Sequence, residues 1–263
     1  MKIIGVFSGG GGLSEGFRKT EKFQFVCHVE KEASACLTLQ LRNIYYYLKS
    51  VNRTNEYKDF LEKKTTLKEL FQSVPNQVVD NVLNYEINDD SLNAIYEYID
   101  KNLQGSKLDG IIGGPPCQAY SLVGRAKNKH RKATDKRIYL YQYYLSFLEK
   151  YQPNFFVFEN VKGLLSFKDE QNKSLFPIIL ESFNSAGYSV SKEIVNSEDY
   201  GVSQKRERLF IVGIKNDVNV KQDFFKVLES YKEKAPNISE LFEDLPDIKS
   251  GEGSNEYKKG TLN

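Results

Sequence analysis

The sequence predicts an α/β protein built on a doubly wound, mostly parallel sheet. Short apolar runs, each the length of one strand, alternate along the chain with amphipathic stretches of helical period. Strands that alternate with helices form parallel sheets covered by helices on both faces. The predicted strands are residues 2–7, 23–29, 108–112, 154–158 and 208–214.

The helices between these strands are predicted from glycine signals and from apolar stripes. Residues 13–20 follow a glycine run, and residues 32–48 follow the second strand. Two further stripes have the spacing of a helix face: Leu92, Ile95, Tyr96, Ile99 and Leu103, and then Ile138, Tyr141, Leu145 and Leu148. We expect residues 1–217 to form the main domain, with a peripheral helical insertion at about 50–82. Residues 218–263, charged and poor in core residues, resemble a linker.

Composition excludes several classes of protein. No apolar run approaches the roughly 18 residues of a membrane helix, and the N-terminus is too short in apolar residues for a secretory signal. Cys27, Cys36 and Cys117 form no CxxC pair, which argues against zinc and for a reducing, cytoplasmic setting. The net charge of +2 gives little overall attraction to nucleic acid, but residues 124–137 hold seven Lys/Arg and one acid.

Four unusual segments follow the predicted strands directly. They are Ser8–Gly12, Glu30, Gly113–Cys117 and Glu159–Asn160. In an open parallel sheet, ligands bind at the carboxyl ends of the strands. We therefore expect these four segments to converge on one edge of the sheet and to form the functional site.

The first two segments have the features of a nucleotide-type cofactor site. The glycines of "FSGGGG", residues 7–12, let the backbone approach a ligand at a helix N-terminus. The spacing is neither a Walker loop nor GxGxxG. Glu30 stands where a carboxylate binds a ribose diol. A tight strand-to-helix turn and a solvated helix-start acid are the alternatives for these two segments.

Cys117 lies in the stiff sequence "GGPPC", close to the basic run. An electropositive neighbourhood favours the thiolate, the nucleophilic form of cysteine. A lone cysteine is otherwise a small buried hydrophobe. The two histidines, His28 and His130, are expected to be packed and solvated respectively, which disfavours a Cys-His dyad.

The remaining polar groups also suit acid–base chemistry. Glu159 emerges from an apolar strand, so burial is expected to raise its pKa and make it a proton donor near neutrality; the alternative is an N-cap or a satisfied buried acid. Arg206 and Arg208 share one side of an extended segment by their spacing of two. They offer rigid donors for a carbonyl oxygen or a phosphate, or else form an exposed charged strand edge.

Taken together, these motifs resemble the cytosine-C5 DNA methyltransferase family. "FSGGGGLSEGF", "IIGGPPCQAYSLVGR", "FVFENVKGLL" and "DYGVSQKRERLFIVG" are similar to its cofactor loop, nucleophile loop, Glu-Asn-Val motif and Gln-x-Arg-x-Arg motif, in the family's order between Lys2 and about Ile214. The resemblance implies a Rossmann-like methyltransferase fold and S-adenosyl-L-methionine as cofactor, with S-adenosyl-L-homocysteine as product. It implies cofactor-binding roles for Phe7, Ser8, Gly9, Gly10, Gly11, Gly12, Leu13, Glu30, Lys31, Glu86, Ile87, Pro116 and Leu140.

The resemblance also implies a mechanism. Cys117 adds to C6 of a cytosine flipped out of duplex DNA, Glu159 holds N3, and Arg208 holds the ring carbonyl oxygen. Asn160, Gln204 and Arg206 brace these groups. The implied DNA contacts are Gln118, Ser121, Arg125, Lys127, Lys129 and Arg131. The Pro-Cys-Phe-Thr motif of the tRNA-methylating branch is absent, which favours DNA.

Two departures from the family pattern matter. Lys31 occupies a position where an apolar residue that packs on adenine is frequent. After Ile214 nothing resembles the target-recognition region or the final Gly-Asn segment, so the sequence is expected to be a truncated form or the larger subunit of a split enzyme, within a restriction-modification system. Residues 218–263 then begin the missing region or form a linker.

Two rival hypotheses come from other classes. A catalytically inactive module that binds DNA or protein has little reason to keep Cys117, Glu159 and Arg208 together. A dinucleotide oxidoreductase accounts for the glycine loop and Glu30 but gives the GGPPC loop no role. No metal and no membrane are expected as partners.

Overall fold

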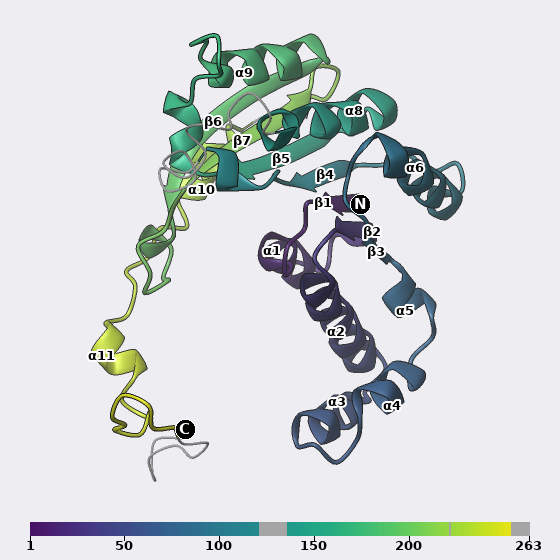
Figure 1. Cartoon of the computed structure of the whole chain (residues 1–263), viewed down its shortest axis with the longest axis vertical. Coiled ribbons are helices and arrows are strands. Elements are labelled where there is room, and N and C mark those ends of the chain that lie inside the picture. The colour runs from purple at the N-terminus through teal and green to yellow at the C-terminus, as the bar shows by residue number, and fades with distance from the viewer. Residues whose placement is uncertain (121–135, 221, 254–263) are drawn as a thin grey trace.

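The computed structural model describes residues 1–120, 136–220 and 222–253, and its core is a seven-stranded sheet (Figure 1). The strand order is β3-β2-β1-β4-β5-β7-β6. The strands are β1 (Lys2–Val6), β2 (Gln24–Glu30), β3 (Val82–Asn84), β4 (Gly110–Gly113), β5 (Phe155–Asn160), β6 (Tyr188–Asn196) and β7 (Glu207–Lys215). Six strands run in the same direction, and β7, between β5 and β6, runs in the opposite direction. The predicted fold class is confirmed, and the order reverses between β1 and β4, where such sheets bind ligands.

Helices cover both faces of this sheet. The main ones are α1 (Gly12–Lys19), α2 (Ala33–Ser50), α6 (Asp89–Leu103), α8 (Tyr141–Tyr151), α9 (Leu175–Ser185) and α10 (Phe224–Glu229). Successive residues of β5 point to opposite faces: Phe156 packs with α6, α8 and α9, and Val157 packs towards α1 and α10. Figure 1 shows α8 and α9 above the sheet, and α1 and α2 below it.

Two strands were not predicted. β3 has only three residues, too few for a visible apolar run. β6 is an edge strand in which Tyr188 alone is fully buried, and its other side chains are half-exposed or exposed. Edge strands of this kind lack the continuous apolar signal of buried parallel strands.

The predicted helical insertion at about 50–82 contains α3 (Thr54–Leu61), α4 (Leu67–Gln72) and α5 (Gln77–Asp80). These helices share a small apolar cluster with the end of α2, built on Ile44, Leu48, Leu70, Val74 and Val79. Figure 1 shows α3 and α4 well away from the sheet. That residues 50–82 are an insertion on the periphery of the main domain stays a prediction.

The chain after 217 differs in part from the linker expected there. α10 buries Phe225, with 6% of its side chain exposed, against Ile3, Ile112 and Val212. Further on, α11 (Ile238–Leu241) projects from the main body (Figure 1), and apolar side chains of this segment are exposed: Tyr231, Ile238, Leu241, Phe242, Leu245 and Ile248. The boundary predicted at 217 therefore lies before a helix that belongs to the core. Within the described ranges, no helix is long and apolar enough to cross a bilayer.

We predict that Gly114→Ala destabilises the fold by about 2–4 kcal/mol, because a Cβ at this position lies 1.8 Å from the Glu159 carbonyl oxygen. Gly16→Ala is the matched control, since no heavy atom lies within 4 Å of its Cβ position and the residue is inside α1. The control is expected to be neutral or slightly stabilising. Urea denaturation of both variants measures the difference, and equal midpoints would contradict the prediction.

Candidate active site

The glycine loop after β1 and the end of β2 are joined by hydrogen bonds. The Gly9 N–H donates to Glu30 Oε2 at 2.7 Å, and the Ser8 N–H donates to the Val29 carbonyl at 3.1 Å. Glu30 Oε1 accepts from the N–H groups of Lys31 and Glu32. The loop turns through positive φ at Gly9 and Gly11, where glycine meets no Cβ penalty. The first two predicted segments therefore meet at one edge of the sheet.

A cavity of about 270 Å³ opens beside this junction. Its lining includes eight of the residues predicted to bind a cofactor: Phe7, Gly9, Glu30, Lys31, Glu86, Ile87, Pro116 and Leu140. Ile87 is buried, and Lys31 Nζ lies 3.6 Å from Glu86 Oε1. Sequence analysis missed three lining residues, Val29, Tyr85 and Arg137. Val29 directly precedes Glu30, Tyr85 directly precedes the predicted pair, and Arg137 ends the basic run.

The GGPPC loop passes directly over the ends of its neighbouring strands. A Cβ on Gly113 would lie 1.8 Å from the Val6 carbonyl oxygen, and one on Gly114 would lie as close to the Glu159 carbonyl oxygen. Asn160, with 1% of its surface exposed, donates from Nδ2 to the Pro115 carbonyl at 3.2 Å and accepts from the Val161 N–H. These contacts explain the two glycines and show that Asn160 braces the loop.

Cys117 follows Pro116 and begins a short 3₁₀ helix, Cys117–Ala119. Its side chain is partly exposed. Two contacts lie just beyond it: Arg137 Nη1 donates to Gln118 Oε1 at 2.6 Å, and the buried Tyr120 hydroxyl donates to the Ile138 carbonyl at 2.7 Å. Residues 118–120 and 137–138 are thus held together close to Cys117. The predicted DNA contacts Ser121, Arg125, Lys127, Lys129 and Arg131 lie outside the described residues, as does His130.

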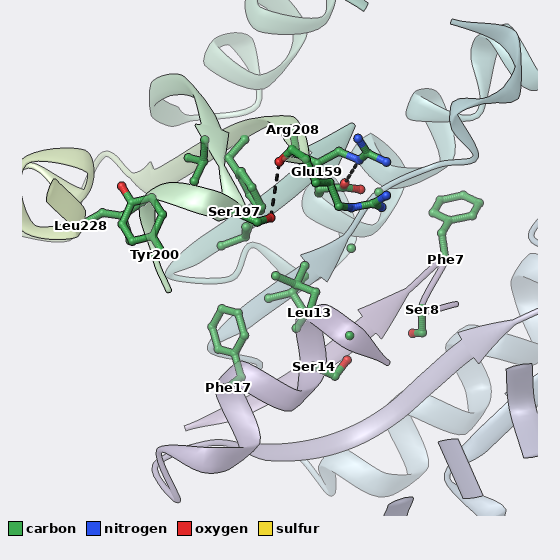
Figure 2. A pocket seen from close by; sticks show the side chains of 18 of the residues that line it. Phe7, Ser8, Leu13, Ser14, Phe17, Glu159, Ser197, Tyr200, Arg208 and Leu228 are labelled. Carbon is green, nitrogen blue, oxygen red and sulfur yellow. Dashed lines mark hydrogen bonds and ion pairs between the residues drawn. The ribbon is translucent and has the colours of Figure 1, made fainter. Parts of the chain in front are cut away.

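A second cavity, of about 630 Å³, lies over the ends of β1, β4 and β5. It is lined by Glu159, Arg206 and Arg208, together with Phe7, Ser8, Gly12 and Leu13 of the glycine loop (Figure 2). Much of the remaining lining is apolar and includes Phe17, Val157, Tyr200, Val202, Phe210 and Leu228. The cavity brings the predicted acid and both predicted arginines next to the predicted cofactor loop.

Electrostatics at Glu159 combine burial with pairing. Arg208 Nε lies 2.9 Å from Glu159 Oε1. Desolvation by burial raises the pKa of the Glu159 carboxyl above its ordinary value, while the charges of Arg208 and Arg206 act in the opposite direction. The net direction is upward, as predicted from a carboxyl at the end of an apolar strand.

Several predicted residues lie outside this cavity. Cys117 is not among its lining residues, and neither Gly10 nor Gly11 lines either cavity. Gln204 is exposed and lines an outer groove formed by residues 198–199, 203–205 and 232–239. The structure therefore groups Glu159 with the two arginines, whereas Cys117 lies outside the lining of this cavity.

The described residues include one histidine, His28. His28 is fully buried and stacks on Phe25, with ring centroids 4.3 Å apart, and desolvation, with the nearby Arg18 charge, lowers its pKa to about 3. It is the packed residue that was predicted. Among those same residues, no group of three or more His, Cys, Asp or Glu is arranged to hold a metal ion.

Two curated relatives resemble this chain over much of its length. One is a type II methyltransferase of Bacillus paralicheniformis, M.Bpa9945I, 35% identical over 96% of this chain and 62% of its own length. The other is M.DdeI, a type II methyltransferase of Desulfomicrobium norvegicum, 38% identical over 64% of this chain and 41% of its own length. The chain thus spans less than two thirds of either relative.

Solved structures agree on the fold. A prophage-encoded protein of Escherichia coli assigned to DNA modification has a TM-score of 0.58 at 21% identity, covering 94% of this chain and 56% of that one. The Dnmt2 methyltransferase of S. pombe has a TM-score of 0.55 at 14% identity, covering 92% of this chain and 58% of that one. At the level of sequence, the model of the C-5 cytosine-specific DNA methylases matches residues 80–262. The chain belongs to the family of C-5 cytosine-specific DNA methylases.

Proposed function

We propose that this chain is the catalytic portion of a DNA (cytosine-5-)-methyltransferase of a restriction-modification system. The observation that carries the proposal is the cavity that holds Glu159, Arg206 and Arg208 against the glycine loop. Methyl transfer to a heteroaromatic ring needs a proton donor, hydrogen-bond donors for the ring and a nearby cofactor site. Glu159, with its raised pKa, the two arginines and the glycine loop supply these groups at one edge of the sheet. The type II methyltransferases similar to this chain support DNA as the substrate.

Cys117 is the proposed nucleophile. C5 of cytosine is a poor nucleophile until a thiolate adds to C6, which turns the ring into an enamine. The Cys117 sulfur forms a bond to C6, and the electron pair of the C5–C6 double bond moves onto C5. After methylation a base removes the C5 proton, the double bond re-forms and the Cys117 thiolate leaves. The Cys117 thiol is partly exposed, which supports its being accessible to a flipped base.

Glu159 and Arg208 are the proposed partners of the ring. Protonated Glu159 donates to N3, so that negative charge does not build up on the adduct, and Arg208 donates to the carbonyl oxygen. The 2.9 Å contact between the two side chains keeps both at the same end of the cavity. Arg206 adds positive charge there, Asn160 fixes the GGPPC loop, and we assign Gln204 a bracing role on the outer groove.

The residues present fit S-adenosyl-L-methionine, which supplies an electrophilic methyl group when bound. Glu30 presents a carboxylate for ribose hydroxyls, and buried Ile87 with Leu140 and Pro116 gives apolar surface for a base. Backbone N–H groups at the start of α1 and the glycine-lined wall suit the amino-acid end. We assign the remaining loop residues Ser8, Gly10, Gly11, Gly12 and Leu13 to this end of the cofactor, and Lys31 and Glu86 to its base.

We further propose that double-stranded DNA is bound with the help of polypeptide beyond the residues seen here, either a second chain or a longer form of this one. The share of the relatives' length that this chain spans supports the proposal. So does the apolar row along residues 231–248, which no described residue covers. Gln118 and the basic residues after it are the proposed phosphate contacts, and a cytoplasmic location remains a prediction. A catalytically inactive binding module is the alternative that the first experiment tests.

We predict a covalent adduct between the chain and duplex DNA that carries 5-fluorocytosine, when the cofactor is present. Fluorine at C5 cannot leave as a proton does, so the Cys117 bond to C6 persists on a denaturing gel. Cys117→Ser should give no adduct, whereas Cys36→Ser, a buried cysteine on α2, should keep it. S-adenosylhomocysteine binding without an adduct would indicate that further polypeptide is needed, and absence of both would favour the inactive module.

The role of Glu159 predicts a rate effect on the same adduct. Glu159→Gln should slow its formation by about 10²–10⁴-fold, because the amide cannot deliver a proton to N3. Glu207→Gln is the matched control, since Glu207 neighbours Arg208 but pairs with Lys162 at 3.1 Å on the surface. Equal slowing in both variants would argue against a specific role for Glu159.

The raised pKa of Glu159 predicts a pH-dependent stability. The folded chain binds this proton more tightly than the unfolded chain does, so the carboxyl stabilises the fold most below its ordinary pKa of 4.5 and this contribution is lost as pH rises through the folded value. The free energy of unfolding of wild type minus that of Glu159→Gln should therefore fall as pH increases from 4 to 7. Urea denaturation across this range measures the difference, and a constant difference would contradict it.

A further inference from the structure

The carbonyl side of the glycine loop is held by a helix that takes no part in either cavity. Arg42, on α2, donates from Nε to the Gly10 carbonyl oxygen at 3.1 Å. The same guanidinium donates from Nη1 to Glu15 Oε2 at 2.9 Å. One planar group thus connects the loop to the first turn of α1.

Tyr46 completes this arrangement. It lies four residues after Arg42 on the same face of α2, and its hydroxyl donates to Glu15 Oε1. Both oxygens of the Glu15 carboxylate are therefore bound from α2. Desolvation by burial acts to raise the pKa of Glu15, but the hydrogen bond from Tyr46 and the charge of Arg42 outweigh it, so the pKa is lowered and the carboxylate stays charged.

The same face of α2 also packs against the loop. A Cβ on Gly11 would lie 2.6 Å from Leu39 Cδ2, so the loop sits on α2 as closely as glycine allows. The opposite side of the loop is tied to β2 through the Gly9–Glu30 bond. The loop thus lies between the end of β2 and one face of α2. Among the described residues, Arg42 donates the only side-chain hydrogen bond to a backbone oxygen of the loop.

We propose that Arg42, held by Glu15 and Tyr46, is a positioning residue that fixes Ser8–Gly12 in the conformation that receives the cofactor. This inference rests on the proposed function, because it assigns the loop to S-adenosylmethionine. Arg42, Glu15 and Tyr46 line neither cavity, so they act through the loop and not on the ligand. Arg42 is half-buried, and its planar guanidinium binds the Gly10 carbonyl and the Glu15 carboxylate at the same time. The geometry of these two hydrogen bonds, and not the positive charge alone, therefore fixes the loop.

The test measures two properties of Arg42→Met and Arg42→Lys: the Kd for S-adenosylhomocysteine by calorimetry, and hydrogen exchange of the amides of residues 9–16. Arg42→Met should weaken binding about 5–20-fold and speed exchange in this segment about tenfold, while the midpoint of global unfolding changes little. Arg42→Lys keeps one charged donor, so its Kd and its exchange rates should lie between those of wild type and those of Arg42→Met. Combined with Glu15→Gln, the effect of Arg42→Met should be less than additive, because Glu15 acts through Arg42.

Arg53→Met is the matched control. Arg53 also binds one carboxylate and one backbone carbonyl, those of Glu56 and Ser73, but it lies at the start of α3. This control should leave both the Kd and the exchange of residues 9–16 unchanged.

Binding and exchange that are unchanged in Arg42→Met, or changed as much in Arg53→Met, would overturn the proposal. If wild type does not bind S-adenosylhomocysteine, the proposed function fails. Faster exchange confined to Arg42→Met would in that case still support the positioning of the loop by Arg42.

Discussion

The candidate site depends on how closely the backbone after β4 crosses the ends of β1 and β5. Gly113 and Gly114 lie so near the Val6 and Glu159 carbonyls that neither position has room for a Cβ. Asn160 then fixes the next residue, Pro115, from the end of β5. Because the crossing is this tight, Pro116 lines the 270 Å³ cavity beside Glu30. Cys117, the next residue, is partly exposed. The position of the thiol is thus set by contacts between backbones.

The charge at Glu159 is governed by segments that come later in the chain. β7 is the antiparallel strand beside β5, and its Phe210 pairs with Glu159. Arg208, two residues earlier on β7, reaches the Glu159 carboxylate, with Nε 2.9 Å from Oε1. The loop that leads to β7 is tied to residues beyond α10: the Gly201 N–H donates to the Glu233 carbonyl, and the Glu233 N–H donates to the Asp199 carbonyl. The loop that precedes Arg206 is therefore held by chain beyond residue 217, where the sequence predicted a linker or the start of a target-recognition region.

The two cavities share Phe7, and so they meet at the glycine loop. One side of the loop faces Glu30 and the apolar residues around Ile87, and the other faces Glu159 and the arginines. A cofactor that spans both would present its reactive end to the acid while its base lies near β2. Because Phe7 and Gly114 line both cavities, the two lie side by side, and we treat them as one candidate active site in a member of the DNA methylase family.

The sequence by itself determined the sheet class, the five buried strands and the residues that follow them, because apolar runs and glycine signals are local. It also indicated Glu159 at the end of an apolar strand, and Arg206 and Arg208 on one side of an extended segment. Only the tertiary structure decided the edge strands β3 and β6 and the burial of Phe225 in the core. It alone also placed Tyr85 and Arg137 in the lining of the 270 Å³ cavity beside Glu30. It also separated Cys117 and Gln204 from the cavity of Glu159. Cavities form between segments far apart in the chain, and their lining depends on packing that no local pattern encodes.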